Sequence, residues 1–227
     1  MTGELDVQDQ VIKKFFTDQL KYRCQPSNLV NPNNWILEAD LRQYLSDTDI
    51  NRQCWKNALR STYKGDEQKM WADLTALLTE KMYSFSNMAV FFKQMQTFTF
   101  AGESFTLFAA SGATIGGDKD FDQNIFSVVF ELTFSVKYEN SSFRFRPDKS
   151  LFLNGFFIGY SELKSNFKGQ TARRNGRQKV ITDYLEAAQA YLQVAKHNDK
   201  SETIRRRMLF PFEKGISITT TTSTILL

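Results

Sequence analysis

FRFRPDKSLFLNGFFIGYSELK, residues 143–164, is the most informative stretch of this chain. Two apolar runs rich in aromatic residues flank the dipeptide Asn154-Gly155. Asn-Gly between such runs is the strongest short-range signal for a β-hairpin. Three of the charged residues in the predicted hairpin stand out: Asp148 on its first arm, and Glu162 and Lys164 on its second. Packing alone does not explain them, because a charged group in apolar surroundings is costly unless it is paired or binds a metal.

The three charged residues have the chemistry needed for metal-assisted hydrolysis of a phosphodiester. Glu162 and Lys164 are two residues apart, so a strand places them on one face. Two carboxylates supply the hard oxygen ligands that Mg²⁺ prefers. A divalent metal activates water and neutralises charge that builds up on a phosphate, and a lysine can hold the attacking water. The alternative is an ordinary hairpin in which Arg146 pairs with Asp148, and Glu162 with Lys164, for little energy.

The spacing of the two carboxylates poses a geometric problem. A strict two-residue loop at Asn154-Gly155 would place Asp148 opposite Ser161, and therefore on the other face of the sheet from Glu162. Bringing both carboxylates to one metal requires a bulge, a longer loop or a bend at Asp148. We expect one of these, because β-bulges are common beside active sites.

The pattern of Asp148, thirteen intervening residues and then Glu162-Leu163-Lys164 resembles the PD-(D/E)xK nuclease signature. The longer run RPDKSLFLNGFFIGYSELKS is similar to the nuclease segment of type I restriction enzyme R (HsdR) subunits, which read RPD, an apolar strand, an NG turn and a strand ending in ELK. A looser similarity extends from about Thr97 to Tyr184. The resemblance implies that Asp148 and Glu162 bind the metal with the carbonyl of Leu163, and that Lys164 is catalytic.

The resemblance also implies accessory residues. Family members open with a helix that bears an acidic residue near the metal, for which Glu4 and Glu38 are the two candidates. The helix after ELK carries a Gln four residues before a Tyr. If Tyr184 is that tyrosine, the position of the glutamine holds Val180, and Gln178 is offset by two. This departure puts the auxiliary motif in doubt and leaves the Asp148, Glu162 and Lys164 set intact.

Composition limits the classes of function. The chain has 227 residues, 41% hydrophobic and 24% charged, which is typical of a globular protein. Its formal charge of +4 permits a polyanionic partner without requiring one. No apolar run has transmembrane length, and the N-terminus lacks the apolar region of a signal peptide, so we expect no membrane contact and a cytoplasmic location. We expect Cys24 and Cys54 to be free thiols.

The single histidine, His197, argues against a histidine-rich zinc site, an HNH nuclease and a Cys-His protease. Gly112 and Gly117 raise the possibility of a phosphate-binding loop, but Asp118 stands where that loop needs Lys. Full-length R subunits contain an ATP-driven motor. We therefore expect this chain to be the nuclease fragment of a longer subunit. ATP would be a cofactor of the full-length subunit and not of this fragment.

Periodicity predicts a helical first part of the chain. Apolar spacing predicts helices over 4–22, 35–45, 49–63 and 66–82, with a loop over 24–34 and a break at Lys64-Gly65-Asp66. Residues 84–96 fit either a helix or a loop. The helix from Trp35 is expected to begin behind an asparagine cap.

From Thr97 onward the pattern predicts β structure. We expect strands in 97–110, a turn-rich loop over 111–123, one long central strand over 124–138, the hairpin, an amphipathic helix over 178–196, a short helix over 201–212 and a strand over 215–222. Glu131 in the central strand is open to two interpretations, a functional carboxylate or a solvent-facing residue. The fold class is therefore α/β: a mixed sheet flanked by helices in residues 97–227, with an N-terminal helical section, residues 1–96, packed on it as one domain.

The segment that follows ELK is basic. Residues 164–179 hold six basic residues and no acidic one, with Gly and Asn between them. A basic loop at this place is suited to the DNA backbone, and its expected contacts are Lys168, Arg173, Arg174, Arg177 and Lys179. The alternative is a solvated loop.

From these observations and the resemblance, we predict that the chain is a Mg²⁺-dependent endonuclease domain of a type I restriction enzyme R subunit, in which Mn²⁺ can substitute for Mg²⁺. By resemblance, its partners are double-stranded DNA and the modification and specificity subunits. Two alternatives stay open: a silent DNA-binding or assembly module on the same fold, and a stand-alone PD-(D/E)xK nuclease. The sequence recognised, the number of metals and the oligomeric state do not follow from the residues.

Overall fold

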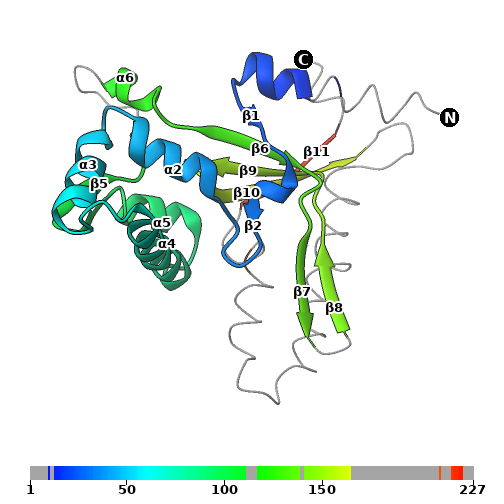
Figure 1. Cartoon of the computed structure of the whole chain (residues 1–227). Helices are drawn as coiled ribbons and strands as arrows, with labels where there is room; N and C mark the ends of the chain where they lie inside the picture. Colours follow the sequence, from blue (N-terminus) through cyan, green and yellow to red (C-terminus); the bar gives the residue numbers. More distant parts are fainter. Residues whose placement is uncertain are drawn as a thin grey trace.

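The computed structural model describes residues 10, 13–110, 117–138, 141–164, 210 and 216–221. For residues 117, 118, 136–138, 141–143, 162–164 and 216–221 it describes the backbone alone. The fold is α/β, with a curled mixed sheet flanked by helices (Figure 1).

The main sheet has the strand order β1-β6-β9-β10-β3-β2, and β11 pairs with β10. Its strands are β1 (Arg23–Cys24), β2 (Val30–Asn31), β3 (Ile36–Leu37), β6 (Phe126–Phe130), β9 (Lys149–Leu153), β10 (Phe156–Lys164) and β11 (Ile216–Thr221). Strands β6, β9 and β10 are antiparallel to one another, whereas β1 runs parallel to β6, and β11 parallel to β10. The predicted strand over 215–222 is confirmed by β11.

Two smaller pairs of strands lie outside the main sheet. One is the hairpin of β4 (Thr97–Phe100) and β5 (Glu103–Thr106), and the other is the ribbon of β7 (Phe134–Tyr138) and β8 (Ser141–Phe145). The sequence predicted strands in 97–110 as part of the main sheet, and the strands are present but form a separate hairpin. They instead pack beside helix α3 (Arg52–Ser61), where Asn51 exchanges two hydrogen bonds with the backbone of Thr106.

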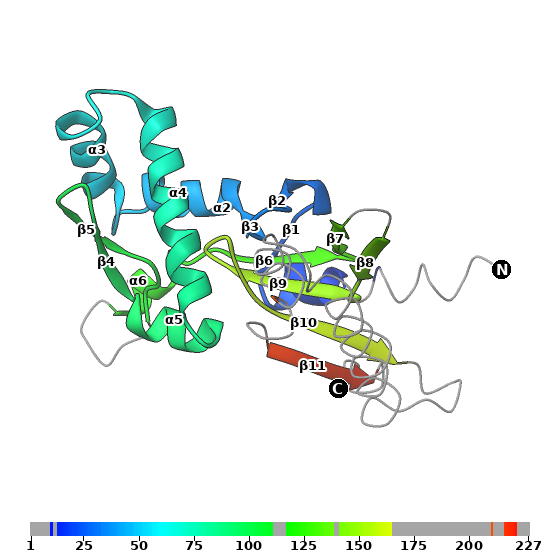
Figure 2. The same cartoon turned by 90° about the horizontal axis from the view of Figure 1, so that it is seen from below.

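The helices gather at one end of the main sheet (Figure 2). They are α2 (Glu38–Asp47), α3, α4 (Glu67–Ser84), α5 (Met88–Gln94) and the short α6 (Gly117–Phe121). The π-helix η1 (Phe15–Gln19) lies apart from this group, against Lys149 at the start of β9, and the 3₁₀ turn η2 (Ser27–Leu29) precedes β2. The predicted break at residues 64–66 is confirmed. Gly65 has φ +91°, and the Asp66 carboxylate accepts a hydrogen bond from the N–H of Lys69, which caps α4.

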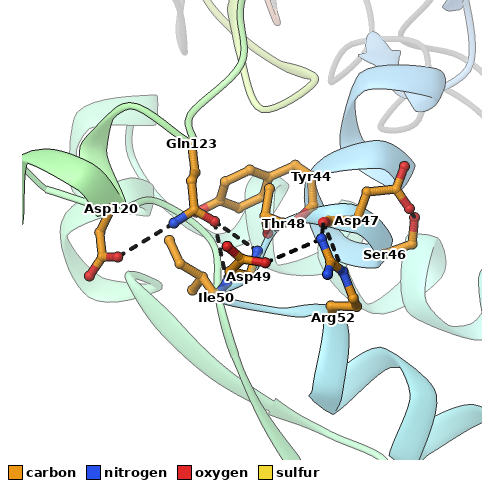
Figure 3. Close-up of polar contacts among 9 residues, drawn as sticks. All are labelled: Tyr44, Ser46, Asp47, Thr48, Asp49, Ile50, Arg52, Asp120 and Gln123. Atoms are coloured by element: carbon orange, nitrogen blue, oxygen red, sulfur yellow. Dashed lines mark hydrogen bonds and ion pairs between the residues drawn. The ribbon is translucent and has the colours of Figure 1, made fainter.

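A network of polar contacts joins the α2–α3 loop to the segment after α6 (Figure 3). The side-chain oxygen of Gln123 accepts hydrogen bonds from the N–H groups of Asp49 and Ile50, at 2.8 and 3.4 Å. On the same loop, Arg52 donates to the carbonyl of Asp47 and forms an ion pair with Asp49. These contacts fix the helical part of the chain to the strands that follow it.

Residues 35–45 were expected to be one helix and are not. Trp35 has φ +60°, Ile36 and Leu37 form β3, and α2 begins only at Glu38 without a side-chain cap. The physical reason is tertiary pairing: Ile36 lies opposite Phe156, and the N–H of Leu37 donates to the carbonyl of Gly155 at 2.8 Å. The N-terminal section therefore contributes β1, β2 and β3 to the main sheet.

Residues 124–138 were expected to be one strand and form two. β6 ends at Phe130, Glu131 takes φ +51°, and the chain leaves the main sheet to form β7. Residues 84–96 contain the helix α5, and residues 13–19 of the predicted first helix are helical. The predicted helix over 178–196 lies outside the described residues, as does most of the one over 201–212.

The Asn154-Gly155 turn is buried against the helical end of the sheet. The Asn154 side chain is fully buried, donates to the Leu107 carbonyl and the Asn124 side chain, and accepts from the N–H of Ile125 at 2.7 Å. Gly155 has φ +84°, and a Cβ there would lie 2.6 Å from the carbonyl oxygen of Leu37. The turn is therefore fixed both by its own conformation and by its contact with α2.

Candidate active site

The β9–β10 hairpin changes register along its length. Leu153 lies opposite Phe156 and Phe152 opposite Phe157, as a two-residue turn requires, but Leu151 then lies opposite Gly159. Ile158 is the extra residue between these pairs. A bulge, one of the three irregularities expected from the sequence, is thus present.

The bulge aligns the two carboxylate positions. Beyond it, Ser150 lies opposite Tyr160 and Lys149 opposite Ser161. One further step in this register brings Asp148 opposite Glu162. Directly opposed residues of an antiparallel pair belong to the same face of the sheet, so the shift removes the difficulty raised by a strict two-residue loop.

Glu131 extends the same row onto β6. Phe130 lies opposite Lys149, and the N–H of Glu131 donates to the carbonyl oxygen of Asp148 at 3.1 Å. Glu131 therefore lies just after the end of β6 and beside Asp148, which lies just before the start of β9, and the same row continued onto β10 reaches Glu162. The Glu131 side chain is 67% exposed and pairs with Arg146 at 3.7 Å.

Asp148 is partly buried at the edge of the apolar core. Its neighbours in sequence, Pro147 and Lys149, are buried, and Lys149 is only 2% exposed. The Lys149 ammonium lies 5.3 Å from the centre of the Phe16 ring in η1. The alternative interpretation of the hairpin paired Arg146 with Asp148; among the described residues, Arg146 forms an ion pair with Glu131 at 3.7 Å.

Glu162, Leu163 and Lys164 lie at the end of β10. Their backbone pairs with Thr219, Thr220 and Thr221 of β11, in parallel register. The strand is thus bordered on both sides, by β9 and by β11. The side chains of these three residues are outside the described atoms, so their positions rest on the backbone register.

The structure places Glu38 away from Asp148. Glu38 starts α2 directly after β3, near the turn of the hairpin, while Asp148 lies at the opposite end of β9. Its carboxylate accepts hydrogen bonds from Asn31, at 2.5 Å, and from Trp71, at 3.4 Å. The other accessory and DNA-contact residues lie outside the described residues: Glu4, Lys168, Arg173, Arg174, Arg177, Gln178, Lys179 and Tyr184.

Two buried charges near the strands were missed by sequence reasoning. Lys149 follows Asp148 directly, and a charge at the start of an apolar strand was the available signal. Asp40 on α2 is 2% exposed, where it accepts hydrogen bonds from Ser127 at 2.5 Å and Gln25 at 2.9 Å. The spacing of apolar and polar residues in α2 did not indicate that Asp40 would face β1 and β6.

Among the described side chains, which do not include that of Glu162, no group of three or more His, Cys, Asp or Glu is arranged to hold a metal ion. The described helices include none with the length and apolar character needed to span a bilayer. Cys24 and Cys54 are free thiols, as expected.

A comparison with protein families identifies one match. A model described as Type I restriction enzyme R protein N terminus (HSDR_N) matches residues 1–207 of the 227-residue chain. No curated protein and no solved structure matches the chain significantly.

Proposed function

Because this chain belongs to the family of type I restriction enzyme R protein N termini, we propose that it is a Mg²⁺-dependent endonuclease domain that hydrolyses DNA phosphodiester bonds. The family is that of a restriction enzyme, which acts on DNA as a multi-subunit complex. The finer assignment, of the metal and of the residues, rests on the β9–β10 hairpin.

The observation that carries the proposal is the register shift at Ile158. A β-bulge leaves one residue of the strand unpaired in the hydrogen-bond ladder, and the packing of an apolar hairpin does not require it. Continued one step past the Lys149–Ser161 pair, the shifted register would bring position 148 opposite position 162. Carboxylates at two opposed positions, one of them half-buried, fit the hard oxygen ligand set of Mg²⁺ or Mn²⁺.

Each residue then has a distinct role. Asp148 and Glu162 would hold the metal with the Leu163 carbonyl, and the metal would supply charge neutralisation at the phosphate and activation of water. Lys164, two residues beyond Glu162 on the same strand, orients the attacking water and offsets the negative charge of the reaction centre. The sheet holds these positions rigidly, because β10 is paired on both edges.

The proposed biological unit is larger than this chain. Modification and specificity subunits would choose the site on double-stranded DNA, and an ATP-driven motor elsewhere in the R subunit would deliver it. The proposed location is the cytoplasm, where DNA and ATP are available. The DNA contacts of the segment after ELK, residues 168–179, belong to the same proposal.

The test is nicking of supercoiled plasmid with Mg²⁺ or Mn²⁺, comparing the unaltered chain with Asp148→Ala, Glu162→Gln and Lys164→Ala. Each change should lower the cutting rate at least about 100-fold. Asp47→Ala is the matched control, since Asp47 is an exposed carboxylate on α2. Calorimetric titration with Mn²⁺ adds a readout without DNA: binding should be lost in Asp148→Ala and kept in Lys164→Ala.

A second arm repeats the assay in the full subunit with its partners and ATP. Cutting in that assembly alone would show a competent nuclease controlled by the motor. Absence of cutting there, with no Mn²⁺ binding at Asp148, would instead support a silent DNA-binding or assembly module.

A further inference from the structure

The β7–β8 ribbon projects from one end of the main sheet (Figure 1). Asp148 lies at that end, because it is between β8 and the start of β9. The chain enters the ribbon just after Glu131 and leaves it just before Asp148. Glu131 and Asp148 are themselves joined by a backbone hydrogen bond. The base of the ribbon is thus tied directly to the candidate site.

Aromatic packing fixes the ribbon on the site strand. Phe134 and Phe145 are both buried and stack at 5.8 Å at the base of the ribbon. Phe134 contacts Phe157 of β10 at 5.2 Å, and Phe145 contacts Tyr160 of β10 at 4.9 Å. Tyr160 is two residues before Glu162, so the ribbon is packed on the face of the sheet to which Glu162 belongs by alternation.

Basic residues follow one another along the strand that leads to Asp148. Arg144 in β8 is exposed, and Arg146 is 59% exposed. The described strands of the ribbon, FSVKY and SSFRF, contain Lys137 and Arg144 and no acidic residue. Arginine is the side chain best matched to phosphate oxygens, through its planar fork of donors.

The ribbon is close enough to the site to reach the same DNA. Asp148 is four positions after Arg144, so their Cα atoms are at most about 14 Å apart. Phosphates of one DNA strand follow one another at about 3.4 Å along the helix axis. Arginines at this distance fall on phosphates within a few nucleotides of a bond cut at Asp148.

Among the described residues, Arg146 has one ion pair, with Glu131, and a DNA phosphate can replace Glu131 in it. Its guanidinium is 3.7 Å from the Glu131 carboxylate, and both side chains are more than half exposed. An exposed pair at this distance is weak and is screened by salt. A phosphate offers the same guanidinium a stronger acceptor, with two oxygens.

We propose that the β7–β8 ribbon is a DNA-backbone clamp, in which Arg144 and Arg146 bind phosphates of duplex DNA beside the scissile bond and Arg146 exchanges Glu131 for a phosphate. This inference rests on the proposed nuclease function, and it names a part of the DNA-binding surface beyond the basic segment after ELK.

The test measures binding without cutting. Fluorescence anisotropy of a labelled 20-base-pair duplex in EDTA gives the Kd of the unaltered chain, Arg144→Ala and Arg146→Ala at several salt concentrations. Each substitution should weaken binding about three- to tenfold and lower the slope of log Kd against log salt by about one. Arg42→Ala is the control: Arg42 is an exposed arginine, paired with Glu67 on α4, and should have no effect.

The variant Glu131→Gln tests whether Arg146 exchanges Glu131 for a phosphate or whether the Arg146–Glu131 ion pair is only structural. Removing the carboxylate frees Arg146, so binding should tighten about two- to fivefold in the unaltered background and stay unchanged in the Arg146→Ala background. Circular dichroism checks that all variants keep their fold.

Several results would overturn the clamp. They are an unaltered Kd in both arginine variants, equal tightening by Glu131→Gln with and without Arg146, and no duplex binding by the unaltered chain. The two proposals fail separately: a chain that cuts but binds DNA equally well without Arg144 and Arg146 loses the clamp alone, and one that binds through them but never cuts loses the nuclease alone.

Discussion

The backbone N–H of Glu131 donates a hydrogen bond to the carbonyl oxygen of Asp148, and Glu131 makes it with φ +51°. That backbone conformation is costly for a residue with a side chain, by about 1–2 kcal/mol. Here it turns the chain out of the main sheet and into the β7–β8 ribbon. The edge of the candidate site is therefore held by backbone geometry at a position where glycine would be the relaxed choice.

The first prediction follows from that conformation. Glu131→Gly should leave the free energy of unfolding unchanged or raise it by up to about 1 kcal/mol, because glycine adopts positive φ freely and the lost ion pair is exposed. Glu131→Val should lower it by about 1–2 kcal/mol, because a β-branched residue resists this conformation. Urea denaturation measures both. A glycine variant less stable than the valine variant would contradict the argument.

The second prediction concerns Asn154, which also has positive φ, at +49°. Asn154→Gly should keep the turn conformation yet lower the free energy of unfolding by about 2–4 kcal/mol, because three buried groups each lose a hydrogen bond to the Asn154 side chain. Lys64→Gly is the matched control. Lys64 has φ +54° and is exposed, so its replacement should not destabilise the chain. Equal effects in the two variants would mean that the amide network contributes nothing.

A third prediction is a pH dependence that arises from Tyr44. Burial raises the pKa of this phenol well above its ordinary value near 10. Above pH 10 the unfolded chain loses the proton and the folded chain keeps it, so stability falls as pH rises, by up to about 1.4 kcal/mol per pH unit. Tyr44→Phe should remove this component. Urea denaturation at pH 8 and pH 11 should show a smaller loss in the variant, and identical losses would rule out Tyr44 as the cause.

The site hairpin was predictable because its signals are local. Asn154-Gly155 gives the turn, and the odd spacing between Asp148 and Glu162 requires one irregularity. What could not be predicted is where a local signal is overridden by pairing. The run from Trp35 has helical spacing, yet Ile36 pairs with Phe156 of β10 as a strand residue. The residues near Ile36 in the sequence give no signal of a pairing partner so distant along the chain.

The division of residues 124–138 was hidden for a different reason. A strand usually ends at Gly, Pro, Asn or Asp, and the break occurs at Glu131, which has no such signature. The residues before and after it, FSVVF and FSVKY, are almost the same pattern. The two strands differ in their tertiary contacts: β6 pairs with β1 and β9, whereas β7 pairs with β8 and stacks Phe134 on Phe145. The sequence therefore predicted the strands of the site without the ribbon beside it.

A fourth prediction tests the bulge by two deletions in β10. Deletion of Ile158 should make the ladder regular and keep Glu162 opposite position 148, so metal-dependent plasmid cutting should survive. Deletion of Ser161 should move Glu162 opposite Lys149 and reduce cutting at least about 100-fold. Circular dichroism must show that both variants fold. Cutting by the second deletion at the unaltered rate would separate catalysis from the register of β10.

Strand β11, residues 216–221, lies beyond residue 207, where the family match ends. It pairs with β10 from Gly159 to Lys164. A fragment trimmed to the matched segment would expose the backbone N–H and C=O groups of that edge, in a long strand whose free side invites pairing with another molecule. Self-association of such a fragment would pair another copy with the backbone of the strand that carries Glu162 and Lys164, so inactivity of the fragment would not by itself test the roles of these residues.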